Sequence, residues 1–177
     1  TGAAAPDSFF EALIAFAKRN QILIVNDNPY SFILREQPKS LLSTAGAREV
    51  ALELNSLSKS HNMAGWRVGM LLGKKEYLST VLKFKSNMDS GMFLSVQMGA
   101  VAALQNPDSW YSDLNVIYKK RQALVFKIMD LLDCKYEEDQ AGMFVWAKIP
   151  STYQNSYELS DEVLYGCDVF LTPGGIF

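Results

Sequence analysis

The feature that most constrains the fold is an uninterrupted run of branched apolar residues, Ile-Leu-Ile-Val, at positions 22–25. Such a run is typical of a parallel β-strand that is covered on both faces. It stops at residues 26–29, Asn-Asp-Asn-Pro, where the proline cannot continue a ladder of backbone hydrogen bonds. The run therefore predicts a strand that belongs to a buried sheet.

The segments around this run follow the order helix, strand, connection, strand. Ser8 stands three residues before Glu11, which is the spacing of a capping box and predicts the start of an amphipathic helix. Two more apolar segments, residues 50–54 and 68–72, are expected to be strands. This order of elements indicates an α/β fold.

The pattern changes to a helical period after residue 74. Helices are expected at about 75–88, 93–105, 108–133 and 157–166, and short strands at 143–147 and 168–171. The turn residues around Pro107 indicate a boundary that divides the chain into residues 1–106 and 107–177. The second part is small for a core of its own, so we expect it to pack against protein that the sequence does not include.

Charge and composition argue against several classes of partner. The chain has 17 Lys+Arg against 19 Asp+Glu and no long basic block, so neither nucleic acid nor an anionic membrane is an expected partner. No apolar run reaches the ~18 residues of a membrane span, and the first residues do not resemble a signal peptide. Two cysteines and one histidine cannot form a disulfide framework or the usual zinc site. We therefore expect a cytoplasmic protein.

Reactive side chains follow the expected strands, at the ends where ligands bind in open α/β sheets. They are a carboxylate, a phenol, two hydroxyls, an amine and a guanidinium, carried by Asp27, Tyr30, Ser56, Ser58, Lys59 and Arg67. Hydrolysis would call for a general base such as histidine, which this set lacks. The set suits a phosphorylated aromatic cofactor.

Two segments resemble the pyridoxal 5'-phosphate (PLP) site of class I/II aminotransferases of fold type I. Residues 26–30 read Asn-Asp-Asn-Pro-Tyr, and residues 56–69 read Ser-Leu-Ser-Lys-Ser-His-Asn-Met-Ala-Gly-Trp-Arg-Val-Gly. The tryptophan beside the arginine is most similar to the subgroup that acts on aspartate, alanine, aromatic amino acids or diaminopimelate. Residues 1–3, Thr-Gly-Ala, resemble the end of the family's Asn-Pro-Thr-Gly turn, and the similarity extends to residues 172–175.

The resemblance implies a fold, an assembly and an incomplete site. Residues 1–106 would be the C-terminal half of the large PLP-binding domain, a mostly parallel sheet with flanking helices. Residues 107–177 would be part of the smaller α+β domain, entered through a long helix. Family members are homodimers, and residues 89–93 would contact the partner's site. Other parts of the family's site would lie outside a chain truncated at both ends, so we expect weak or no transamination from it alone.

The resemblance also implies roles for the side chains at the strand ends. Lys59 would form a Schiff base with PLP and then move a proton as general base and acid. Asp27 would keep the pyridine nitrogen protonated, and Tyr30 would donate a hydrogen bond to the ring oxygen. The phosphate would be held by Arg67 with the hydroxyls of Ser56 and Ser58.

The implied reaction moves an amino group between an amino acid and a 2-oxo acid, and alternatives to it stay open. Decarboxylases and synthases share the same lysine-centred site, so another PLP reaction is possible. Residues 56–59 also match the Ser-x-x-Lys pattern of penicillin-binding acyl enzymes, although neither Ser-Asp-Asn nor Lys-Thr-Gly occurs. A fragment without catalysis is a further alternative. Taken singly, Asp27 could be a turn former and Lys59 a solvated surface lysine; their joint order and spacing favour the PLP site.

Overall fold

The larger sheet places the ends of its strands side by side. The structure, a computed structural model, describes residues 2–35 and 37–177. Within these residues the sheet contains β1 (Ile24–Asp27), β2 (Ala51–Ser56) and β3 (Gly69–Gly73), in the order β1-β2-β3. β1 is parallel to β2, and β3 is antiparallel to it. The fold is therefore α/β, as the sequence predicts.

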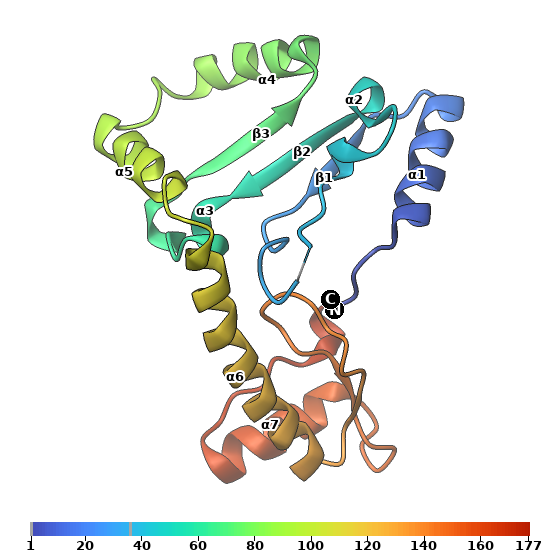
Figure 1. The fold of residues 1–177 in the computed structure, drawn as a ribbon. Helices are drawn as coiled ribbons and strands as arrows, with labels where there is room; N and C mark the ends of the chain where they lie inside the picture. Colours follow the sequence, from blue (N-terminus) through green and yellow to red (C-terminus); the bar gives the residue numbers. More distant parts are fainter. Residues whose placement is uncertain (1, 36) are drawn as a thin grey trace.

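Helices surround this sheet and continue into a second part of the chain (Figure 1). Those near the sheet are α1 (Asp7–Asn20), α2 (Ala47–Val50), α3 (Leu57–Ser60), α4 (Lys75–Met88) and α5 (Leu94–Leu104), with the 3-10 helices η1 (Leu41–Ser43) and η2 (Ala64–Trp66). The long helix α6 (Ser109–Leu131) leads away from the sheet to α7 (Ser156–Cys167). The four helices predicted after residue 74 are confirmed, with ends that differ from the expected ones by at most two residues.

The first helix begins differently from the prediction. Its N-cap is Pro6, and no side chain caps it, so Ser8 lies inside the first turn and the capping box with Glu11 is wrong. Proline suits a helix start because its missing N–H would have no partner there. Asp7 adds a negative charge at the positive end of the helix dipole.

The first strand is later and less covered than its apolar run predicts. The strand starts at Ile24 and ends at Asp27, and the side chain of Val25 is 54% exposed. Within the described residues β1 pairs with β2 alone, so it is an edge strand with one neighbour. Because the Val25 side chain is exposed, the prediction of cover on both faces is wrong for this chain.

The second part contains less strand than expected. Among the described residues its sheet consists of β4 (Lys135–Tyr136) paired antiparallel with β5 (Ala147–Lys148). Only the last residue of the expected strand at 143–147 is in β5, and the expected strand at 168–171 does not form. Residues 168–171 pair with no strand in the described chain and lead to η3 (Gly174–Ile176), and Phe170 is exposed. An extended segment becomes a strand only where a ladder partner is available.

One core cluster joins the two parts of the chain. Ile33, in the connection after β1, packs with Leu114 and Tyr118 of α6. The Ile33 carbonyl also accepts a hydrogen bond of 2.9 Å from the Gly142 amide. Packed apolar side chains therefore connect residues on the two sides of the predicted domain boundary near residue 106. The boundary itself stays a prediction.

Removal of the Ile33 side chain tests this connection. Ile33 is 0% exposed, so Ile33→Ala should lower the free energy of unfolding by about 2–5 kcal/mol, the usual effect of such a cavity. Leu124→Ala, at an exposed position of α6, is the matched control and should change it by less than about 0.5 kcal/mol. Urea unfolding measures both. Equal effects of the two substitutions would contradict the packing described.

Candidate functional site

Strand register brings the predicted site residues to one edge of the sheet. Asp27, the last residue of β1, is paired with Leu54, and Ser56, the last residue of β2, is paired with Gly69 at the start of β3. Helix α3 follows β2 directly, and η2 precedes β3. The end of β1, the end of β2 and the start of β3 therefore face one region, beside α3 in Figure 1.

Asp27 and Tyr30 line the same small cavity. Its volume is about 240 Å³, and the rest of its wall consists of residues 2–4, 28–29, 31, 35, 141–142 and 144. The rings of Tyr30 and Phe144 meet edge to face, with centroids 5.6 Å apart. The Asp27 carboxylate is exposed and belongs to none of the ion pairs in the described chain. A charged acceptor is thus open to a ligand in this cavity.

Lys59 lies next to this cavity. Its Nζ atom is 6.0 Å from the centroid of the Tyr30 ring, at the limit for a cation–π interaction. The side chain is half-buried and, within the described residues, is not in an ion pair. Tyr30 is therefore close both to the carboxylate and to the amine that the sequence singled out.

The two predicted serines are bonded to one another. Ser56 is the N-cap of α3, where its Oγ accepts a hydrogen bond of 3.1 Å from the Ser58 amide. The two hydroxyl oxygens are 2.9 Å apart, and Ser56 Oγ is 3.2 Å from the Val68 carbonyl oxygen. The hydrogen bonds of Ser56 in the described chain do not include Lys59, so the geometry gives no support to an acyl enzyme in which that lysine activates the serine.

Arg67 has a strained backbone. Its φ of 56° lies in the left-handed region, which costs a residue with a side chain on the order of 1 kcal/mol. The exposed guanidinium donates to the Ala64 carbonyl at 3.2 Å and is in no ion pair of the described chain.

The start of β3 requires a glycine at position 69. A Cβ atom there would lie 2.9 Å from the Asn55 carbonyl oxygen of β2.

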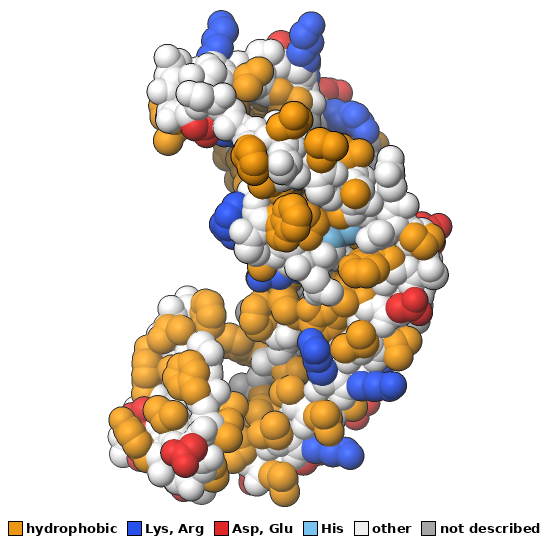
Figure 2. All heavy atoms as spheres, turned by 90° about the vertical axis from the view of Figure 1, so that its left-hand side faces the viewer, with side chains coloured by type: hydrophobic (Ala, Val, Ile, Leu, Met, Phe, Trp, Pro, Cys, Tyr) orange, Lys and Arg blue, Asp and Glu red, His pale blue; other side chains and the backbone are white. Residues whose placement is uncertain are grey.

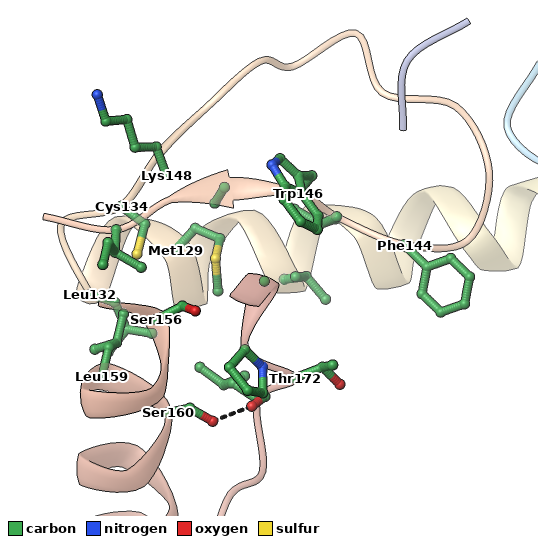
Figure 3. A pocket seen from close by; sticks show the side chains of 17 residues that line it. Met129, Leu132, Cys134, Phe144, Trp146, Lys148, Ser156, Leu159, Ser160 and Thr172 are labelled. Atoms are coloured by element: carbon green, nitrogen blue, oxygen red, sulfur yellow. Dashed lines mark hydrogen bonds between the residues drawn. The ribbon is translucent and has the colours of Figure 1, made fainter. Parts of the chain in front are cut away.

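The structure thus places the six predicted residues along one edge but not in one pocket. Asp27 and Tyr30 line the cavity, whereas the four others do not. A larger cavity of about 620 Å³ lies elsewhere, between α6, β5 and α7, and contains none of the six (Figure 3). Its wall is mainly apolar; Lys148 points away from it, and the Ser160 hydroxyl donates to the Leu171 carbonyl. The described residues also contain no group of acidic, histidine or cysteine side chains that could hold a metal ion.

Comparison with known proteins gives the family. The family model for class I and II aminotransferases matches residues 1–177. The chain belongs to this family. The resemblance stated from residues 26–30 and 56–69 is therefore confirmed.

Relatives of this aminotransferase-family chain are about twice its length. The LL-diaminopimelate aminotransferase of Natranaerobius thermophilus is 39% identical over 176 residues, which are 98% of this chain and 45% of that protein. The enzyme of the same name from Nitratidesulfovibrio vulgaris (Miyazaki F) is 36% identical over 180 residues, which cover 100% of this chain and 46% of that enzyme. Apo-BacF of Bacillus subtilis superposes with a TM-score of 0.92 at 35% identity, over 99% of this chain and 45% of that one. The chain spans about half the length of the relatives it matches, and it has their fold over that span.

Sequence reasoning missed a buried carboxylate in this aminotransferase-family chain. Glu53 lies in β2, opposite Asn26 of β1, and is 3% exposed. Its carboxylate accepts hydrogen bonds from the side chains of Asn26, Asn28 and Ser40 and from the Leu41 amide. The available signal was a charged residue in the otherwise apolar segment 50–54.

A second buried network ties α3 to α6. Ser60 Oγ and His61 Nδ1 are 2.8 Å apart, and His61 Nε2 is 3.2 Å from the Tyr111 hydroxyl. Trp110 Nε1 donates to the Ser60 carbonyl at 2.8 Å. The residues that follow Lys59 are therefore fixed to the first turn of the long helix. Burial lowers the pKa of His61 below its ordinary value.

The His61 shift predicts how stability depends on pH. Since the pKa of this histidine is lower in the folded chain, the unfolded chain binds the proton first as the pH falls. The free energy of unfolding should therefore decrease as the pH falls through about 6.5 and level off below the folded pKa. Urea unfolding between pH 7.5 and 5 measures it, and His61→Gln should lose this component. An unchanged pH slope in the variant would show that other groups cause it.

Proposed function

We propose that this chain carries the lysine-bearing side of the PLP site of an aminotransferase. The observation that supports it most is the cluster at the sheet edge, where Lys59 Nζ lies over the ring of Tyr30 and Tyr30 shares a cavity with Asp27. The enzyme would move an amino group between an amino acid and a 2-oxo acid. The chain spans about half the length of its curated relatives, so the transamination that we propose is the activity of the whole enzyme.

The chemistry of the donor set fits PLP. This cofactor has an aldehyde, a phosphate and a pyridine nitrogen, which need an amine, a cation and a carboxylate respectively. Lys59, Arg67 and Asp27 supply these groups, and none of the three is in an ion pair of the described chain. When bound, PLP supplies an electron sink that stabilises negative charge at the substrate carbon.

The side chains have different tasks in the proposed site. Lys59 Nζ would hold the cofactor covalently and, once released, take and return the proton at the substrate carbon. The Asp27 carboxylate would favour the protonated pyridine nitrogen, because an adjacent negative charge stabilises a positive one. The Tyr30 hydroxyl would donate to the ring oxygen.

The phosphate would be bound at the other end of the sheet edge. Arg67 would donate charge-assisted hydrogen bonds to its oxygens, and the hydroxyls of Ser56 and Ser58 would add neutral ones. The left-handed backbone of Arg67 is consistent with this role, because strained residues occur often at ligand sites.

The names of the relatives favour diaminopimelate among the possible amino-acid substrates. We further propose a homodimer that works in the cytoplasm. Apolar side chains gather on the face shown in Figure 2, and such patches are typical of protein interfaces. The exposed ones of α4, α5 and the turn between them are Val81, Leu82, Phe84, Met88, Met92, Phe93, Leu94, Met98, Val101 and Leu104. No helix in the described part of the chain is long and apolar enough to cross a membrane.

Covalent trapping tests the proposed lysine. The chain is mixed with PLP, reduced with borohydride and digested, and the label is located by peptide mass spectrometry. We expect the label at Lys59 and its loss in Lys59→Ala, while Lys83→Ala, an exposed lysine of α4, leaves the Lys59 label unchanged. A label spread evenly over surface lysines, or none at Lys59, would contradict a PLP site in this chain.

Neutralisation of Asp27 tests the partner of the pyridine nitrogen. A hydrogen bond to a charged group contributes roughly 1.5–3 kcal/mol, so Asp27→Asn should raise the Kd for PLP about tenfold or more. Absorbance titration measures this Kd. Asp113→Asn removes an exposed carboxylate of α6 and should leave it unchanged. The same Kd for Asp27→Asn and Asp113→Asn would remove Asp27 from the site.

A further inference from the structure

The carboxylate of Glu53 is held entirely by hydrogen-bond donors. Oε2 accepts from Asn26 Nδ2 at 3.1 Å, from Ser40 Oγ at 3.0 Å and from the Leu41 amide at 2.7 Å. Oε1 accepts from Asn28 Nδ2 at 3.2 Å. None of the ion pairs in the described chain includes Glu53, so these donors are what compensates its buried charge.

Two of the donors flank Asp27. The side-chain amides of Asn26 and Asn28 both donate to Glu53. Successive side chains of a strand point to opposite faces, so the Asp27 side chain leaves β1 on the face opposite to Asn26. The main chain is fixed as well, because the Asn28 amide donates to the Leu54 carbonyl at 2.8 Å. β1 is an edge strand in the described chain, so Glu53 supplies side-chain bonds at the end of a strand that has one neighbour.

We propose that Glu53 is a positioning residue for Asp27. It anchors the residues before and after Asp27 to β2, and this anchoring aims the Asp27 carboxylate into the cavity that it shares with Tyr30. The inference rests on the proposed function, in which Asp27 faces the pyridine nitrogen of PLP.

The bond pattern explains why a carboxylate is needed at position 53. A glutamine could keep its oxygen at the Oε2 position, where three donors converge, and its amide nitrogen would then face Asn28 Nδ2. A rotation of the Asn28 amide that presents its oxygen to the glutamine would lose a second hydrogen bond, because Asn28 Nδ2 also donates to the Lys39 carbonyl at 2.9 Å. Glu53→Gln therefore disturbs Asn28 selectively and keeps the volume of the side chain.

Ser40 provides the control for a purely structural role. Its hydroxyl donates to Glu53 from the N-cap position of η1 and, within the described chain, does not bond either residue that flanks Asp27. If Glu53 only stabilised this loop, Ser40→Ala and Glu53→Gln would have the same effects. If Glu53 positions Asp27, Glu53→Gln and Asn28→Ala would affect the end of β1, whereas Ser40→Ala would not.

The first experiment needs no PLP. Amide hydrogen exchange of the full chain is compared at Asn28 and at the amides that join β2 to β3. Glu53→Gln should speed exchange at Asn28 about tenfold relative to those ladder amides, whereas Ser40→Ala should leave the ratio unchanged. An unchanged ratio in Glu53→Gln, or the same change in both variants, would overturn the proposal.

The second experiment measures PLP affinity in a double-mutant cycle. Glu53→Gln should raise the Kd about tenfold when Asp27 is present and leave it unchanged in Asp27→Asn, because Glu53 acts through Asp27. Additive effects, or an unchanged Kd in Glu53→Gln alone, would overturn the positioning role. If the unsubstituted chain takes no label at Lys59, the proposed function fails for this chain, and hydrogen exchange still decides whether Glu53 anchors the end of β1.

Discussion

The pairing of β1 and β3 with the central strand β2 fixes where the reactive side chains of this chain can lie. The parallel register sets Asp27 beside Leu54, and the antiparallel register sets Gly69 beside Ser56. A slip of one residue would turn Asp27 to the opposite face of the sheet. The carboxylate, the hydroxyls and the arginine lie along one edge of the sheet because the strand ends share that edge, and this explains why residues far apart in sequence can belong to the site we propose.

Local patterns in the sequence were sufficient to predict the helices and to place Asp27 and Lys59 near the strand ends. Helices α4 to α7 repeat apolar residues over several turns and end at clear breakers such as Pro107, so their ends are predicted within two residues. The strand-end rule places Asp27 and Lys59 at the edge where the structure has them. Both predictions depend on short stretches of chain.

The failures concern features that depend on distant residues. Residues 168–171 have a strand-like composition but no ladder partner in the described chain, and Val25 is exposed because the described residues leave its face of β1 open to solvent. The role of Glu53 could not be predicted, since its four donors come from β1, from the residue after it, and from the N-cap and first residue of η1. The prediction that Ser8 caps the first helix was wrong for a local reason, because the helix already begins after Pro6.

The site depends on two separate buried networks rather than on its own loops. Helix α3 has four residues, too few to be stable alone, so Lys59 is held by the bonds of Ser60 and His61 to α6. Asp27 is held from the other side, through the neighbours that Glu53 binds. The separation between amine and carboxylate therefore follows from how α6 and β1 each attach to the central strand and its α3 extension. A change in either attachment would alter the geometry of the site while leaving all six predicted side chains in place.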